Sequence, residues 1–282
     1  MNLHAILAIT NLSPQGNRAV LRAAMLAAQR RALLKIMYAP SDADDAVRTE
    51  VAQELKRLAA EMHTRFDILV KNVAGIGGHL DAVAEEARWA DMLVVGEQWN
   101  QSSKAFSCGR PIERLQRVVH CPILLARLEG VDRYRRVLVA IDSAPDPSSL
   151  LQLARSLYGD ADVEPFYPLF RASDSPSARP SRAGALPRRG DVARHALTQE
   201  QHPSADLIVV GKGRRYSFSG FLFGQMAHRV LRLTSRDVLL VPHDLRLDPV
   251  AGMTKSSRAL RNRATIVHLS VDAPGSARPL PQ

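Results

Sequence analysis

A seven-residue sequence occurs twice in this chain, as ADMLVVG at Ala90–Gly96 and as ADLIVVG at Ala205–Gly211, with five identical positions. The same offset of 115 residues carries the Ile-Leu-Leu run that begins at Ile123 onto a Val-Leu-Leu run. Upstream, an offset of 131 residues carries ILAIT, which begins at Ile6, onto VLVAI. Because the two offsets differ by 16 residues, the chain is predicted to be a tandem repeat whose second copy lacks about that length in its middle.

Each copy alternates between short apolar runs and amphipathic stretches. AILAI at Ala5–Ile9 is too short for a helix and is typical of a buried parallel strand. The apolar residues between Ala19 and Leu33 recur instead at helical spacing. Strands that alternate with helices require right-handed crossovers and a parallel sheet covered on both faces, which predicts an α/β fold of two tandem doubly wound parallel sheets. The expected strands of the first copy are Ala5–Ile9, Leu33–Pro40, Asp67–Val73, Met92–Gly96 and Ile123–Ala126, and those of the second are Arg135–Asp142, Val163–Leu169, Leu207–Gly211 and Val238–Pro242.

The length of 282 residues suits two domains of roughly 100 to 150 residues each. We expect repeat one to span residues 1–128 and repeat two to span residues 135–244. Repeat two has an Arg-, Pro- and Ser-rich insertion at 171–190 where repeat one has a long helix and its third strand, so the second copy is predicted to be shortened. Residues 245–282 form a basic tail that we expect to be disordered.

The net charge of +10 is concentrated in two segments. Five Arg against one Asp give residues 171–190 a charge of +4, and six Lys or Arg against two Asp give residues 245–282 another +4. A basic segment can hold nucleic acid or an anionic membrane, so an adaptor that works through these segments stays open as an alternative function. Solvated linker and tail are the favoured interpretation, and we expect no nucleic-acid partner.

Several features favour a cytoplasmic protein without a membrane span. No apolar run approaches the ~18 residues that a transmembrane helix needs. The start MNLHAILAITNL has no basic region and no small-residue cleavage site, unlike a signal peptide. Cys108 and Cys121 lack metal-ligand spacing, so we expect a loop thiol and a buried small side chain.

The openings ILAITNLSP and VLVAIDSAP, the repeated ADxxVVG and the closing HCPILLAR resemble the universal stress protein family in its tandem-domain form, from about Met1 to His243. The resemblance implies a five-stranded parallel sheet of strand order 3-2-1-4-5 in each copy. It also implies that Ile123–Ala126 runs antiparallel beside Val238–Val241, which makes the chain an intramolecular pseudo-dimer, with a homodimer left open. Ligands would bind beyond the carboxyl ends of strands one and four, at the topological switch point.

Nucleotide-binding members of the family resemble GxxGx9G followed by Ser or Thr at the exit of strand four, where glycines let backbone amides approach phosphates. Repeat one departs from this pattern, with Trp99 at the second glycine position, Arg110 at the hydroxyl position and Asn11 in place of the family's Asp after strand one. We therefore expect no ATP site in repeat one.

Repeat two keeps more of the pattern and has the candidate cofactor-binding residues, with Lys212, Arg214 and Gln225 nearby. On one interpretation the acid meets a ribose, the glycine amides meet phosphates, and the basic side chains compensate charge. On the other interpretation, Asp142 orders a turn and the basic residues point into water. This second interpretation is favoured over tight ATP binding because Arg214 fills space that a phosphate needs. The candidates are Asp142, Gly211, Gly213 and Gly224.

No nucleophile elbow or P-loop sequence occurs, and the histidines His195, His202, His228 and His243 lack metal-ligand spacing. We predict a non-catalytic stress-response protein that acts by binding, with a degenerate adenine-nucleotide crevice for ATP in repeat two, and we expect a protein partner. A nucleotide-hydrolysing or phosphotransfer enzyme on the same fold, in effect a weak ATPase, is the alternative enzyme class.

Overall fold

The computed structural model describes residues 1–39, 48–73, 80–99, 111–130, 133–140, 147–166, 205–211, 227, 230–232 and 234–242. All of them lie in one compact unit, Met1–Leu247. The expected segments at 171–190 and 245–282 lie outside the described residues, as does Cys108.

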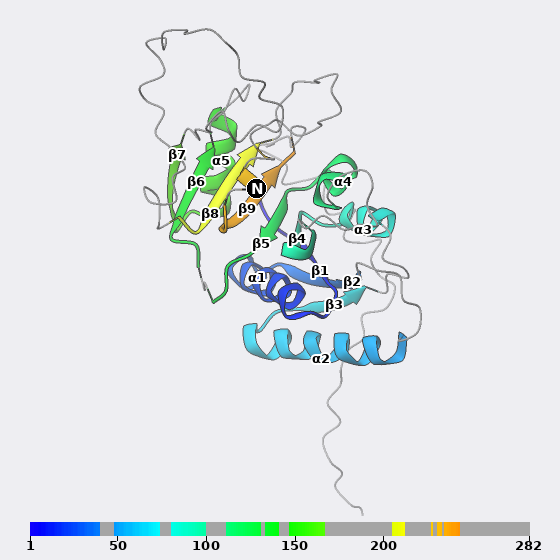
Figure 1. Ribbon diagram of the computed structural model, residues 1–282. Helices are drawn as coiled ribbons and strands as arrows, with labels where there is room; N and C mark the ends of the chain where they lie inside the picture. The colour runs from blue at the N-terminus through cyan, green and yellow to red at the C-terminus, as the bar shows by residue number, and fades with distance from the viewer. Residues whose placement is uncertain are drawn as a thin grey trace, which may run out of the picture. The chain divides into compact units, whose positions relative to one another are not determined.

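Strands and helices alternate from β1 to β5, and in the described part of repeat two a helix, α5, lies between β6 and β7 (Figure 1). The strands are β1 (Ala5–Thr10), β2 (Leu33–Tyr38), β3 (Val70–Val73), β4 (Met92–Gly96), β5 (Ile123–Ala126), β6 (Arg136–Ala140), β7 (Asp162–Phe166), β8 (Leu207–Gly211) and β9 (Asp237–Val241). The helices are α1 (Pro14–Arg30), α2 (Arg48–Phe66), α3 (Leu80–Ala87), α4 (Pro111–Val118) and α5 (Pro147–Leu157), with a 3-10 helix η2 (Glu97–Trp99) after β4.

The described strands form one sheet in the order β3-β2-β1-β4-β5-β9-β8-β6-β7. The first five are parallel and confirm the expected order 3-2-1-4-5. In repeat two, β7, β6, β8 and β9 correspond to the second, first, fourth and fifth strands, and they are also parallel to one another. The described part of repeat two thus has no counterpart of the third strand, as the shortened second copy predicts.

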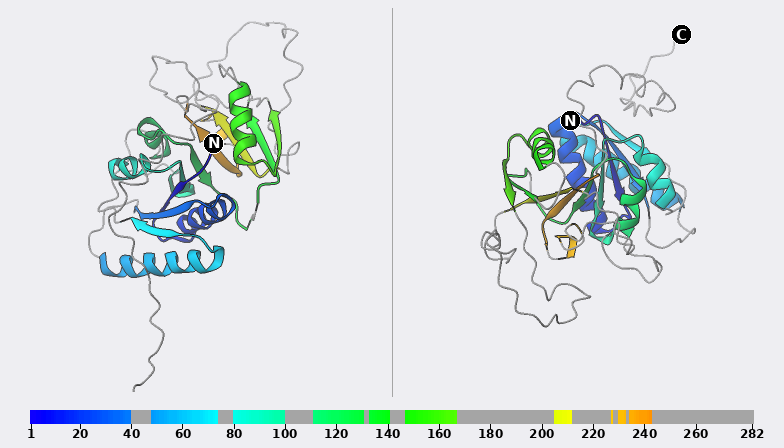
Figure 2. Two further views of the ribbon diagram at one scale, coloured as in Figure 1. Left: turned by 180° about the vertical axis from the view of Figure 1, so that it is seen from behind. Right: turned by 90° about the horizontal axis from the view of Figure 1, so that it is seen from above.

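The two halves join where β5 runs antiparallel beside β9, which confirms the pairing implied by the resemblance. Ile123 lies opposite Leu240, and Leu125 lies opposite Val238. Figure 2 shows the strands of repeat two, coloured green to orange, on the β5 side of repeat one. Because each half covers the apolar edge of the other, neither of these strands is left as an open edge.

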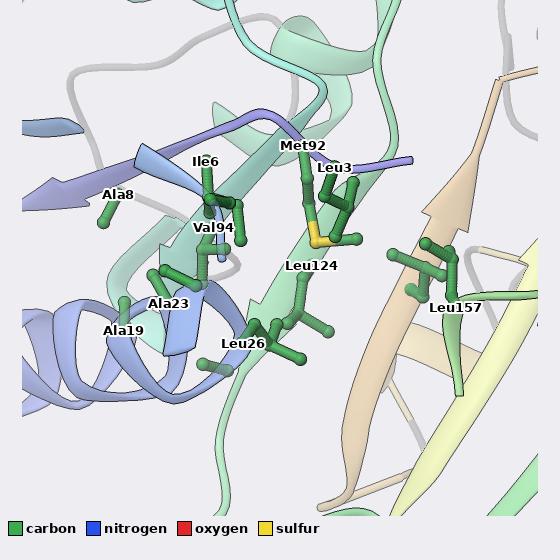
Figure 3. Packing of buried hydrophobic residues seen from close by; sticks show 14 of the residues in the cluster. Leu3, Ile6, Ala8, Ala19, Ala23, Leu26, Met92, Val94, Leu124 and Leu157 are labelled. Atoms are coloured by element: carbon green, nitrogen blue, oxygen red, sulfur yellow. The ribbon is translucent and has the colours of Figure 1, made fainter. Parts of the chain in front are cut away.

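Buried side chains form two hydrophobic clusters, one on each face of the sheet. Ile6 and Ala8 of β1 belong to the first cluster, whereas Leu7 and Ile9 belong to the second, which is the alternation of a strand buried on both faces. Figure 3 shows part of the first cluster, in which the α1 side chain Leu26 lies near Leu124 of β5. This cluster includes α5 residues as well as α1 and α2 residues, so one core runs through both repeats.

Local backbone geometry explains where one element differs from expectation. Helix α2 ends at Phe66, and the strand that was expected to begin at Asp67 begins at Val70. Asp67 has a φ of 51° and its N–H donates to the His63 carbonyl at 2.9 Å, which is a left-handed helix cap. A residue in that conformation cannot start a strand.

The repeated acidic residue of ADxxVVG connects the start of strand four to the start of strand one in both copies. In repeat one, a carboxylate oxygen of Asp91 accepts from the backbone N–H of His4 at 2.7 Å and of Ala5 at 3.1 Å. In repeat two, Asp206 accepts from Arg135 at 2.7 Å and from Arg136 at 3.1 Å. Each repeated Asp therefore holds the start of the first strand of its repeat. This role was not predicted from the sequence.

Candidate functional site

Strands one and four are neighbours in each repeat, so their carboxyl ends lie at the predicted switch point. Ala8 of β1 pairs with Val94 of β4, and Ala140 of β6 pairs with Val210 of β8. In doubly wound sheets this is where ligands bind. We refer to these places as the repeat-one exit and the repeat-two exit.

The turn after β1 is closed by its own polar side chains. The Asn11 side-chain oxygen accepts from the hydroxyl of Ser13 at 2.5 Å and from its N–H at 3.2 Å. The same hydroxyl of Ser13 accepts from the N–H of Gly16 at 3.1 Å and so caps α1. A Cβ on Gly16 would lie 2.5 Å from the Asn11 side-chain oxygen, so only glycine fits there. In repeat one the residue at the family's acidic position therefore orders a helix start.

The end of β4 is also filled by groups of repeat one. A Cβ on Gly96 would lie 2.8 Å from the Gln15 carbonyl and closer still to the side-chain oxygen of Gln98. Both polar atoms of the Gln98 amide are buried without a hydrogen-bond partner in the described part of the chain. Trp99 is only 7% exposed and packs in the second hydrophobic cluster. Among the described residues, a side chain at Gly96 would thus meet the Gln15 backbone and the Gln98 side chain.

The repeat-two exit contains Gly211, the only predicted site residue that falls within the described residues. Gly211 ends β8, and a Cβ there would meet the Leu150 side chain at 3.3 Å. That is a tight contact with a flexible methyl group, in contrast to the backbone carbonyl at Gly96. The other predicted residues lie outside the described residues: Asp142, Lys212, Gly213, Arg214, Gly224 and Gln225.

Arg127, directly after β5, connects the repeat-one exit to repeat two. Its guanidinium makes an ion pair with Glu97, the residue that follows Gly96. It also donates to the carbonyls of Leu231 at 2.7 Å, within the described helical residues 230–232 of repeat two, and of Thr234 at 2.6 Å. A cation at helix-end carbonyls is favourable because those carbonyls have no partner inside the helix.

A second connection between the repeats is buried. Asp237, at the start of β9, is fully buried and accepts from the backbone N–H groups of Arg127 at 2.7 Å and Leu128 at 2.8 Å. The hydroxyl of Tyr134 donates to its other oxygen at 2.6 Å. Arg22 of α1 places its Nε 3.0 Å from the same oxygen and its guanidinium 4.9 Å from the centre of the Tyr134 ring. A buried ion pair of this kind is tolerated because its remaining acceptors are hydrogen-bonded.

The sequence carries one signal for this network. Arg22 lies on the apolar face of the first helix, and the offset of 131 residues places Leu153 at the corresponding position of repeat two. A charge in one copy at a position that is apolar in the other indicates a contact that only one copy makes. Sequence analysis did not use that difference.

Burial raises the pKa values of three described side chains, Tyr134, Tyr158 and Cys121. Burial, followed by the Asp237 carboxylate, raises the pKa of Tyr134 well above its usual value. Burial raises the pKa of Tyr158 as well, and its ring packs edge-on against Tyr134 at 5.3 Å. Burial raises the pKa of the Cys121 thiol to about 12, which confirms the expected buried side chain and leaves little thiolate at neutral pH.

The described residues contain neither a metal-binding cluster nor a helix suited to a bilayer. No cluster of three or more His, Cys, Asp or Glu side chains in that part of the chain is arranged to hold a metal ion. None of the described helices combines the length and apolar character that crossing a bilayer requires. Glu86 of α3 pairs with the buried amine of Lys35 at 2.7 Å. The histidines named above lie outside the described residues.

Residues 185–242 match the model of the universal stress protein family. No curated protein matches the chain. A universal stress protein from Archaeoglobus fulgidus DSM 4304 has a similar structure, with a TM-score of 0.55 and 13% identity over 85% of this chain and 98% of that chain. A proposed universal stress protein from Pseudomonas aeruginosa UCBPP-PA14 is similar with a TM-score of 0.52 and 17% identity, over 85% and 93%. The family match and the shared fold confirm the resemblance predicted from the sequence.

Proposed function

Because repeat two matches the universal stress protein family and both repeats together have the fold of such proteins, we propose that this chain is a stress-response protein that acts by binding rather than by catalysis. The proposal assigns it a degenerate adenine-nucleotide crevice at the repeat-two exit and places it in the cytoplasm. Two cysteines without disulfide-type spacing suit that reducing compartment.

The difference between the two exits carries the proposal. At the repeat-one exit, the Gln15 carbonyl and the Gln98 amide lie over Gly96, and Trp99 is buried beside them. At the repeat-two exit, the described side chain that a Cβ at Gly211 would meet is the aliphatic one of Leu150. A phosphate needs glycine amides that it can approach closely, so repeat two suits it better than repeat one.

The sequence after strand one points the same way. In repeat one, Asn11 is engaged by the hydroxyl of Ser13. Repeat two has Asp142 at the position of Asn11 and Ala144 at the position of Ser13, so the hydroxyl partner is missing. In the proposal, Asp142 accepts from a ribose hydroxyl, and the amides at Gly211, Gly213 and Gly224 face the phosphates. Lys212 and Arg214 supply compensating positive charge.

Matched glycine substitutions test the proposal. We expect ATP to bind once per chain in calorimetry, and Gly224→Val to abolish binding because a branched side chain blocks the approach of phosphate to the amides. Gly109→Val, the equivalent change in repeat one, should leave binding unchanged. Arg214→Gly combined with Gln225→Ser restores the family pattern and should strengthen binding.

Two results would count against the crevice. Equal loss of binding in Gly109→Val and Gly224→Val would place the nucleotide elsewhere or in both repeats. Absence of ATP binding in both the natural chain and the restored double variant would leave a nucleotide-free protein that works through protein partners.

A further inference from the structure

Away from both exits, a cavity of about 310 Å³ opens beside α1. It lies where α1, the end of α2 and the segment after β5 meet, and it shares no residue with either exit as described above. Its lining consists of Arg18, Leu21, Arg22, Met25, Arg65, Phe66, Leu128, Glu129 and Gly130. A volume near 300 Å³ is at the small end of the range for ligand pockets.

The walls of the cavity combine an apolar surface with arginine side chains. Leu21 and Met25 of α1 are half-buried, and Phe66 and Leu128 face the same space while also being half-buried. Leu21 and Met25 are four residues apart in α1, which places them on one side of the helix. Mostly apolar walls with a few charged groups are typical of sites for small organic molecules.

Two of the three arginines already have carboxylate partners. Arg22 pairs with buried Asp237 at 3.0 Å, and Arg18 pairs with exposed Glu129 at the rim. Arg65 lies over the ring of Phe66, 5.3 Å from its centre, and has no carboxylate partner among the described residues. Three guanidinium groups therefore face two carboxylates, which leaves one positive charge at the cavity.

From this arrangement we propose that the cavity binds a small organic anion with one carboxylate and an apolar body. The carboxylate pairs with Arg65 and, at the rim, competes with Glu129 for Arg18, since a guanidinium matches a carboxylate in bidentate geometry. The apolar body lies against Leu21 and Met25. A single charge neutralises the site, whereas a dianion such as a phosphate monoester would add a negative charge without a partner. The proposal does not depend on nucleotide binding.

Octanoate is a suitable probe for calorimetry on the full chain. We expect one octanoate per chain, and we expect Arg65→Met to weaken binding by about 10-fold to 100-fold because it removes a charge-assisted contact. Arg57→Met is the matched control, since Arg57 is an exposed arginine on the same helix that pairs with Glu54 at 3.9 Å. It should leave the affinity unchanged. Glu129→Gln should tighten binding by up to about fivefold because it releases Arg18 from an exposed ion pair.

Two further comparisons separate this site from nonspecific adsorption. Octylamine has the same chain with the opposite charge and should not bind. Leu21→Trp fills the cavity and should abolish octanoate binding while ATP binding, if present, stays unchanged. Failure of octanoate to bind the natural chain, equal weakening by Arg57→Met and Arg65→Met, or equal binding of octylamine would each overturn the proposal.

Discussion

At the scale of single residues, Asp237 has the most demanding environment in the described chain. Its carboxylate is fully buried and is bound by two backbone amides, the Tyr134 hydroxyl and the Arg22 guanidinium. Removing one member of a buried ion pair leaves an uncompensated charge and typically costs 3–5 kcal/mol. The network thus connects Arg22 and Tyr134 to the start of β9.

Tyr134 and Tyr158 form a matched pair for a stability test. The Tyr134 hydroxyl donates to Asp237, whereas the Tyr158 hydroxyl is buried without a partner in the described part of the chain. We expect Tyr134→Phe to lower the free energy of unfolding by about 1–3 kcal/mol at pH 8, and Tyr158→Phe to change it little. Urea unfolding measures both values. Equal costs would contradict the assigned hydrogen bond.

Both tyrosines should also make the free energy of unfolding fall at alkaline pH. The folded-state pKa values of both tyrosines are raised, so the contribution of each is complete below the unfolded value near pH 10 and is lost as the pH rises further. Above pH 10 each tyrosine should lower the free energy of unfolding by about 1.4 kcal/mol per pH unit. Either Phe variant should therefore show a shallower alkaline decline than the natural chain.

At the scale of elements, the repeated Asp connects two strands that are adjacent in the sheet and distant in sequence. Asp91 holds the start of β1, and Asp206 holds the start of β6, with matching distances in the two repeats. A carboxylate that accepts two backbone N–H groups satisfies donors that the strand's own pairing leaves free.

We therefore expect Asp91→Ala and Asp206→Ala each to lower the free energy of unfolding by about 1–3 kcal/mol. Asp→Asn at either position keeps one acceptor oxygen and should cost less. Asp160→Ala, in an exposed turn, is the control and should stay within about 0.5 kcal/mol of the natural chain. Chemical unfolding of the five variants measures these free energies. An equal loss of unfolding free energy in Asp160→Ala and Asp91→Ala would contradict a special role of the repeated Asp in holding the strand.

At the scale of the whole described unit, the antiparallel pair β5–β9 joins two parallel half-sheets into one. Leu124 and Leu239 pair across this junction and are completely buried. In a separate repeat the same strands would be open apolar edges, which readily pair with other chains. Covalent linkage of the repeats keeps this partner at high effective concentration.

Expressed separately, residues 1–130 and 133–244 should each self-associate or aggregate, because each exposes one of these edges. Size-exclusion chromatography with light scattering measures this directly. Mixing the two fragments during refolding should give a one-to-one complex of the mass of the intact core. Two monodisperse, monomeric fragments would show that the junction is not needed to cover the edges.

The sequence by itself determined the repeat, and from the repeat came most of the fold. Apolar runs and helical spacing are local properties, so β5 and α1 were placed within a few residues of their observed positions. The family resemblance added the strand order and the β5–β9 pair. The start of β3 was missed because a left-handed cap at Asp67 leaves little trace in the hydrophobic pattern.

For the candidate site, the sequence determined which positions depart from the family pattern, including Trp99 and Asn11. Only the tertiary structure decided which groups surround Gly96 and Asp237, because several of those groups come from segments distant in sequence. Gln15 and Gln98 reach Gly96 from different segments, and Tyr134 reaches Asp237 across 103 residues of sequence. Contacts of this kind depend on packing between elements that are distant in sequence, whereas the hydrophobic period that specifies each strand and helix is contained within the segment itself.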